Sequence, residues 1–187
     1  MKESFMKNLL RRLAVSIGIV ASVPCVQAHV VLSEPKAIAG SYYKATLRVG
    51  HGCSGSGTNA LIVQVPAGFE GAKPQPKFGW TITTRKDKLS RPYKSHGKTV
   101  TDDVVELRWT ASSKEAALPD EQFDEFAFMG RLPDVAGPMW IKVFQACEQG
   151  ANDWSEVPTS GNSTRGLKSP AALLDVIPAQ AIDHHHH

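Results

Sequence analysis

The residue best suited to metal chemistry is a histidine that follows the tripeptide Val26-Gln27-Ala28. This tripeptide ends an apolar leader, and its small last residue is typical of a signal-peptidase cleavage site. We therefore expect cleavage after Ala28, which makes His29 the first residue of the mature protein. A terminal histidine offers two nitrogen ligands, its α-amine and its ring Nδ1, which together can chelate a metal ion. Imidazole nitrogen suits copper, and Cu(II) stands at the top of the Irving–Williams order.

Residues 1–28 have the parts of a secretory signal peptide. Four basic residues precede an apolar run over residues 13–23, which is too short to span a bilayer as a helix. A lipoprotein signal with Cys25 as the lipidated residue is the competing interpretation, but the residues before it match that pattern poorly. We predict a periplasmic or secreted protein. The four histidines at 184–187 are interpreted as a truncated purification tag.

The mature part of the chain is balanced in charge. Residues 29–183 contain 17 Lys or Arg and 17 Asp or Glu. The composition therefore gives no electrostatic reason to expect nucleic acid or an anionic membrane as a partner, and we predict no stable membrane insertion of the mature domain. The 155 residues of this part are enough for one domain with a substantial core.

Two cysteines, Cys53 and Cys147, remain after the predicted cleavage. In an oxidising compartment they most simply form a disulfide. That bridge closes a loop of about 94 residues, which is worth on the order of 4–5 kcal/mol in the chain-entropy description. The alternative is that both thiolates bind copper, which would favour Cu(I), whereas a terminal histidine favours Cu(II).

Period-two alternation of apolar and polar residues dominates the chain, and Gly and Pro punctuate nearly every junction. The sequence therefore predicts an all-β single domain, an antiparallel β-sandwich of the immunoglobulin-like or cupredoxin-like kind. Trp109 and Trp140 fall within strand patterns, so we predict that both lie in the core. The predicted strands cover residues 30–33, 43–49, 61–65, 80–84, 105–109, 123–129 and 139–146.

Two polar stretches do not fit the strand pattern. Residues 86–101 are predicted to form a long hairpin loop, and residues 158–170, rich in Ser, Gly, Pro and Thr, to follow the surface or to be mobile. A short strand or turn is expected over residues 171–177. We expect the sandwich to span residues 29–158 and a Pro/Ser/Gly-rich C-terminal segment to span 159–183.

Two further histidines remain in the mature part. His51, in Gly50-His51-Gly52-Cys53, follows a predicted strand. If that strand pairs with the first one, its end approaches the N-terminus, and His51 supplies a third nitrogen beside the amine and ring of His29. The alternative is that His51 only caps a loop next to the disulfide. His96 lies in a polar stretch and is predicted to be solvated.

Carboxylates and one tryptophan complete the candidates. Glu34, Asp124 and Glu125 could compete for an open coordination position, and Glu125 is the preferred candidate as a ligand or as a group beside one. An Arg or a backbone N–H would satisfy a buried carboxylate equally well. Trp154 follows Cys147 by seven residues, so a disulfide would carry it towards His51. There an indole could shield copper from water, or it could be a core aromatic.

Through these residues the chain resembles the YcnI-like family of secreted domains, also called DUF1775, over essentially the whole mature domain. The matching motifs are Ala28-His29-Val30, Ala39-Gly40-Ser41-Tyr42, Arg48-Val49-Gly50-His51-Gly52-Cys53, Val65-Pro66-Ala67-Gly68, Lys73-Pro74-Gln75-Pro76-Lys77, Gly79-Trp80, Leu118-Pro119-Asp120, Phe123-Asp124-Glu125-Phe126 and Trp154-Ser155-Glu156-Val157-Pro158.

The resemblance implies a β-sandwich that binds one copper ion through an N-terminal histidine brace. It also implies a role in copper homeostasis as a periplasmic carrier, chaperone or store, with other copper carriers or copper membrane transporters as partners. In this pattern His29 is the terminal histidine and Trp154 is the tryptophan near the metal. The third ligand remains open between His51 and a carboxylate such as Glu125.

Three functions are therefore compared. The first is a copper-binding protein without enzymatic activity. The second is a copper-dependent polysaccharide monooxygenase, which would share the histidine brace, although the sequence has no evident flat aromatic motif for a sugar polymer. The third is a metal-free interaction module in which His29 is incidental.

Overall fold

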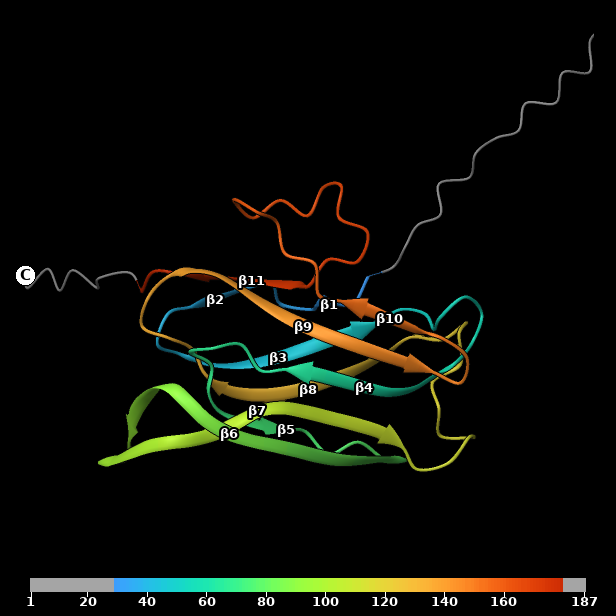
Figure 1. The fold of residues 1–187 in the computed structure, drawn as a ribbon, viewed down its shortest axis with the longest axis horizontal. Coiled ribbons are helices and arrows are strands. Elements are labelled where there is room, and N and C mark those ends of the chain that lie inside the picture. Colours follow the sequence, from blue (N-terminus) through green and yellow to red (C-terminus); the bar gives the residue numbers. More distant parts are fainter. Residues whose placement is uncertain (1–28, 180–187) are drawn as a thin grey trace, which may run out of the picture.

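The computed structural model describes residues 29–179 as eleven β-strands in two sheets (Figure 1). The predicted signal peptide, the tag and the last residues of the C-terminal segment lie outside this described range. Within it, no helix is long and apolar enough to cross a membrane. The buried apolar side chains of both sheets form one core, which confirms the predicted all-β sandwich.

The smaller sheet carries the N-terminal residues of the described chain. Along β3 the apolar side chains Tyr43, Ala45, Leu47 and Val49 all face the core, as their period-two spacing predicts. The sheet is antiparallel throughout. In spatial order its strands are β1 (Val31–Leu32), β3 (Tyr42–Val49), β8 (Asp124–Arg131) and β5 (Glu70–Pro74).

The larger sheet is organised around β9. One edge of β9 pairs with β4, and the other edge pairs first with β11 and then with β10. The β2–β11 pair is parallel, which is the exception to the predicted antiparallel arrangement. The strands are β2 (Lys36–Ile38), β11 (Ala172–Ile177), β9 (Gly137–Cys147), β4 (Thr58–Gln64), β7 (Lys98–Ala111) and β6 (Trp80–Ser95), with β10 (Ala151–Trp154) beside β9.

Aromatic rings link the two sheets. Phe126 on β8 meets Trp80 with ring centroids 4.9 Å apart and Trp109 with centroids 5.9 Å apart, both edge to face. Trp109 is fully buried, as predicted. Trp140 is only half-buried, so its prediction as a core residue was wrong. The alternation along β9 turns its neighbours Met139 and Ile141 inward and therefore turns Trp140 outward.

Residues 86–101 form strands, and the prediction of a loop there was wrong. β6 and β7 pair as a long ribbon along the lower side of Figure 1. His96 and Gly97 form its turn, with φ angles of 48° and 76°, the positive values that a two-residue hairpin turn of type I′ requires. Over residues 86–101 the ribbon exposes both faces, so this part needs no apolar alternation and its sequence resembles that of a loop.

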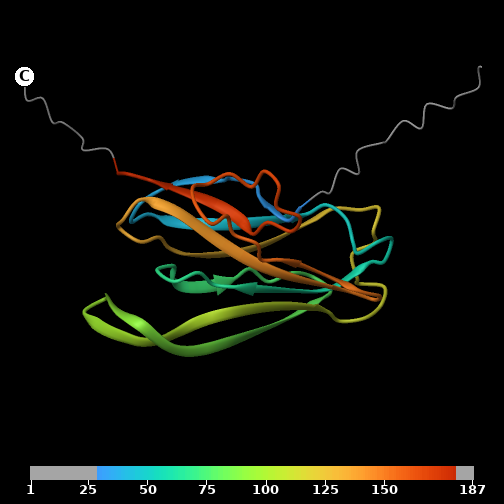
Figure 2. The same ribbon diagram turned by 45° about the horizontal axis from the view of Figure 1, so that its top comes forward.

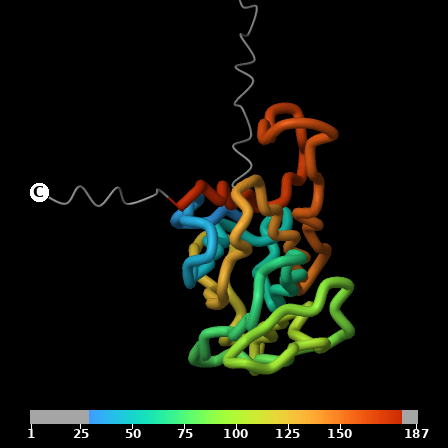
Figure 3. Tube along the Cα trace, turned by 90° about the vertical axis from the view of Figure 1, so that its left-hand side faces the viewer, coloured from blue at the N-terminus to red at the C-terminus, as the bar shows by residue number. Residues whose placement is uncertain are grey.

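The predicted domain boundary at residue 158 was also wrong, because the sandwich continues to Ile177. The apolar alternation of β11 buries Leu174 and Val176 in the core, where β11 covers part of an edge of β9. The intervening residues 155–171 leave the edge after β10 and return to it at β11. They loop out from the body of the domain, as Figures 1 and 3 show, and in Figure 2 this loop comes forward and overlaps the sheet.

Candidate metal centre

The pairing of β1 with β3 sets the position of both candidate histidines. Val31 lies opposite Arg48 in this antiparallel pair. His29 precedes β1 by two residues, and His51 follows β3 by two residues, so both come to the same end of the sheet. The described chain begins there, next to β10 (Figure 1). The expectation that the second strand brings its end to the N-terminus is confirmed.

One indole contacts both imidazole rings. The ring of Trp154 lies 5.5 Å from that of His29 and 6.3 Å from that of His51, between centroids, with interplanar angles of 72° and 79°. These are edge-to-face arrangements. Trp154 is 3% exposed, whereas both histidines are partly exposed. The structure therefore brings together three residues that the sequence analysis singled out.

The hydrogen bonding of His51 leaves one ring nitrogen available. Its Nδ1 lies 2.5 Å from the carbonyl oxygen of Gly52. A carbonyl oxygen can only accept a hydrogen bond, so Nδ1 carries the proton and Nε2 retains its lone pair. Nε2 could thus bind a metal ion without loss of this hydrogen bond.

The loop that carries His51 is tightly held. A Cβ atom at Gly52 would lie 1.9 Å from the carbonyl oxygen of Ser56, so the loop requires glycine there. The N–H of Gly52 donates to Asp120 (2.9 Å). Cys53 forms the predicted disulfide with Cys147, at the end of β9. Because the two sulfurs bond to each other, they are not copper thiolates, and such a bridge is typical of periplasmic and extracellular proteins.

A buried glutamine, which the sequence analysis missed, connects the two sides of this centre. The side chain of Gln145 donates to the carbonyl oxygen of His51 (2.7 Å) and accepts from the indole N–H of Trp154 (2.9 Å). A signal was present in the sequence. Gln145 occupies a core-facing position of β9, in step with Ile141 and Val143, and a polar residue in such a series needs an internal partner.

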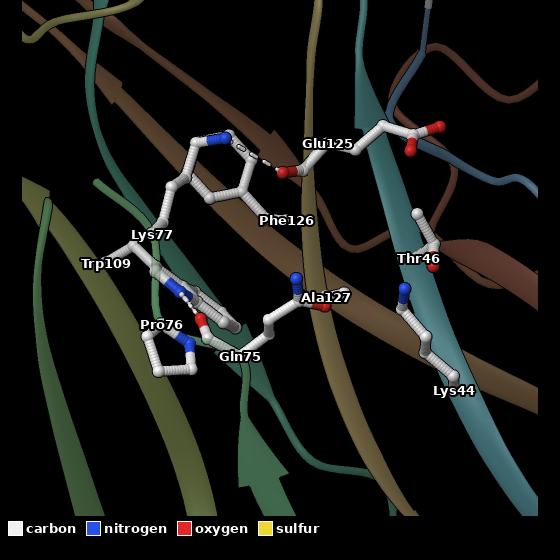
Figure 4. A pocket seen from close by; sticks show the side chains of 9 residues that line it. All are labelled: Lys44, Thr46, Gln75, Pro76, Lys77, Trp109, Glu125, Phe126 and Ala127. Carbon is white, nitrogen blue, oxygen red and sulfur yellow. Dashed lines mark hydrogen bonds between the residues drawn. The ribbon is translucent and has the colours of Figure 1, made fainter. Parts of the chain in front are cut away.

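The acidic candidates have other partners. The carboxylate of Glu125 accepts from the hydroxyl of Ser33 (2.9 Å) and pairs with Arg48 (3.4 Å). Lys77 donates to the backbone carbonyl oxygen of Glu125 (3.1 Å), and Figure 4 shows the Glu125 carboxylate pointing away from Lys77. Asp124 pairs with Lys77 (2.6 Å).

Side chains alone do not make a complete metal site in residues 29–179. No group of three or more His, Cys, Asp or Glu side chains in this range could hold a metal ion. Glu34 is exposed at the surface. His96 is exposed at the turn of the ribbon, as predicted. A centre at His29 and His51 therefore needs a further ligand of another kind, and the α-amine of a mature N-terminus is one.

The centre is open to solvent on one side. A groove of about 460 Å³ has His29 in its wall and runs between β1 and the first half of β11. Asn162 and Thr164, from the loop that follows β10, form part of its wall. An ion can thus reach His29 from the groove, whereas Trp154, the aromatic neighbour of His29, is buried.

Comparisons with known proteins agree with this architecture. The model of a family described as "Domain of unknown function (DUF1775)" matches residues 29–176. A solved structure of an uncharacterized protein from Nocardia farcinica, described as having an immunoglobulin-like fold, is similar at 24% identity and a TM-score of 0.59. That match covers 79% of this chain and 97% of the other, and it shows an immunoglobulin-like fold here. The search of curated proteins gave no match.

Proposed function

The chain belongs to the DUF1775 family, and from that premise we propose that it is a copper-binding protein of the periplasm or cell exterior. It acts there as a carrier, chaperone or store in copper homeostasis rather than as an enzyme. Copper is its cargo. The observation that carries the proposal is the contact of His29 and His51 with the same indole.

The donor set fits Cu(II). Cleavage after Ala28 frees the α-amine of His29, which chelates the ion together with the ring of the same residue. His51 contributes Nε2, since its Nδ1 is engaged with the Gly52 carbonyl. Three nitrogen donors suit Cu(II). With Cys53 and Cys147 in a disulfide, the described residues offer no thiolate from either cysteine that would favour Cu(I).

The open groove supports the role of a carrier. A protein that passes copper to a second carrier or to a membrane transporter must leave its metal within reach of the partner's ligands. The groove leaves His29 accessible from one side. The buried indole of Trp154, which contacts both histidines, keeps water from the side on which it packs.

An equilibrium titration with Cu(II) tests the proposal. Protein that begins at His29 is compared with protein that retains Ala28, in which the nitrogen of His29 is an amide. We expect one tightly bound Cu(II) per chain in the first protein and an affinity at least tenfold lower in the second. Equal affinities would refute the role of the α-amine, and absence of Cu(II) binding by the first protein would refute the function.

A further inference from the structure

Gln145 is one of few polar side chains that the core of the described domain contains. The others that are buried are Thr58 and Asp103. Gln145 is 1% exposed, and a buried amide destabilises the folded state unless its hydrogen bonds are made. Its Nε2 donates to the His51 carbonyl oxygen (2.7 Å) and to the Thr58 hydroxyl (2.7 Å). Its Oε1 accepts from Trp154 (2.9 Å) and Asn152 (3.4 Å).

The partners fix the orientation of this amide. An indole N–H can only donate, and a backbone carbonyl can only accept. The side chain between Trp154 and His51 must therefore present an acceptor at one end and a donor at the other. A glutamine does so, whereas an ionised carboxylate lacks the donor and an alkyl chain lacks both.

The amide also joins parts of the molecule that are far apart in the chain. His51 follows β3 in the smaller sheet, and Trp154 ends β10 in the larger sheet. Gln145 lies opposite Asn152 in the β9–β10 pair. The side chain of Asn152 donates a second, longer hydrogen bond to the His51 loop, at the Gly52 carbonyl oxygen (3.3 Å). Two neighbouring amide side chains thus tie the His51 loop to the strand that carries Trp154.

We propose that Gln145 is a positioning residue of the metal centre, which holds the His51 loop and the Trp154 indole in fixed relation so that both imidazoles contact that indole. Its effect on copper rests on the proposed function. Its effect on the two aromatic contacts is a property of the metal-free protein. The two parts can therefore be tested separately.

The first arm of the test uses metal-free protein that begins at His29. Hydrogen exchange of the Trp154 indole N–H is measured by NMR, with the indole N–H of Trp109, which donates to the Gln75 carbonyl (3.2 Å), as the internal reference. In Gln145→Leu we expect exchange at Trp154 to become at least tenfold faster relative to Trp109. The ring resonances of His29 and His51 should shift, because the indole ring current acting on them changes.

Two further variants separate positioning from general destabilisation. Gln145→Glu keeps an acceptor for the indole but loses the donor to the His51 carbonyl, so we expect a protected Trp154 N–H together with shifted His51 resonances. Asp103→Asn alters another buried hub, which accepts hydrogen bonds from the Gly71 N–H (2.8 Å) and the Tyr93 hydroxyl (2.7 Å). This control should lower stability without any change in the exchange at Trp154 or in the histidine resonances.

The second arm measures Cu(II) affinity. Groups that orient metal ligands change affinity about 10- to 100-fold when they are replaced, and we expect a loss in this range for Gln145→Leu but not for Asp103→Asn. Unchanged exchange and unchanged histidine resonances in Gln145→Leu would overturn the proposal. If that variant does not fold, unchanged His51 resonances in Gln145→Glu would do so. If the parent protein binds no Cu(II), the proposed function fails, and the metal-free arm still decides the role of Gln145.

Discussion

At the scale of single residues, the position of His51 depends on a neighbour that has no side chain. A Cβ atom at Gly52 would overlap the Ser56 carbonyl oxygen, and the Gly52 N–H is bonded to Asp120. The carbonyl of Gly52 also accepts from the ring of His51. Gly52 therefore lets the loop close tightly enough to present the histidine with Nε2 available.

We predict that Gly52→Ala destabilises the fold by about 1–3 kcal/mol, the usual cost of inserting a methyl group where there is no space. Cu(II) affinity should fall as well, because the loop must shift. Urea denaturation and a copper titration measure the two effects. Gly161→Ala is the control. Gly161 has a positive φ (68°), so alanine strains the backbone there, but its Cβ would meet nothing within 4 Å, and copper affinity should stay unchanged. Equal affinity in both variants would contradict the account.

At the scale of elements, β9 is the strand that assembles the centre. It pairs with β4 on one edge and with β10 and β11 on the other, and it carries both Gln145 and Cys147. The disulfide fastens the His51 loop to the end of β9, while β10 places Trp154 beside it. The two histidines flank strands of the smaller sheet, whereas Gln145, Cys147 and Trp154, which hold them in place, belong to the larger sheet.

Replacement of both Cys53 and Cys147 by alanine should lower the free energy of unfolding by about 2–5 kcal/mol, because the bridge restricts a long loop in the unfolded chain. Urea denaturation of the variant against the oxidised parent protein provides the measurement. The reduced parent protein is the control and should match the variant. A variant as stable as the oxidised parent would show that the bridge does not stabilise the fold.

The contribution of β11, the last strand, to the core can be tested by substitution. Leu174 is fully buried, so Leu174→Ala should cost about 2–5 kcal/mol, as for other large-to-small substitutions in cores. Leu167→Ala, in the loop between β10 and β11, is the matched control, and we expect a much smaller loss because Leu167 is only half-buried. Thermal or urea unfolding decides between these values. Similar small losses in both variants would mean that β11 does not cover the core.

The sequence predicted those parts of the fold and the centre that have a local signature. Alternation along residues 43–49 identifies a strand with one buried face, and two cysteines that follow a predicted signal peptide predict a bridge. Residues 86–101, where β6 and β7 continue to their turn, have no such signature, since strand segments exposed on both faces need no alternation. The pairing of β10 and β11 with one edge of β9 depends on contacts distant in the chain. Gln145 is a polar residue at a core-facing position of β9. Its need for an internal hydrogen-bond partner can be recognised only when the register of that strand is known.

At the scale of the whole molecule, two tyrosines couple stability to alkaline pH. Burial, together with the nearby Glu34, raises the pKa of Tyr43 to about 12. Burial and the hydrogen bond to Asp103 raise the pKa of Tyr93 to about 12. In an unfolded chain the pKa of tyrosine is about 10. Between these values the folded state retains protons that the unfolded state has lost.

The free energy of unfolding should therefore be highest, with respect to these groups, below about pH 10, and it should fall as the pH rises towards 12. Urea denaturation at several pH values in this window measures the slope. The double variant Tyr43→Phe/Tyr93→Phe should show a shallower slope than the parent protein. Parallel slopes would contradict the assignment of alkaline sensitivity to these two residues.

The molecule separates the candidate metal centre from the third histidine of the described residues, His96. His29 and His51 lie where β1 begins and β3 has ended, whereas His96 lies at the turn of the β6–β7 ribbon. The pairing of β4 with β7 and β9 places this turn beyond the opposite end of β4 from Cys147. His96→Ala is thus a control for any experiment that removes a histidine from the centre.

The most direct test of the proposed copper centre is an electron paramagnetic resonance spectrum of Cu(II) bound to protein that begins at His29. We predict hyperfine coupling to nitrogen from the amine and both imidazoles. His51→Ala should lose one nitrogen coupling, and His96→Ala should give the spectrum of the parent protein. An unchanged spectrum in His51→Ala would contradict the centre described here, because it would leave His29 as the only histidine ligand.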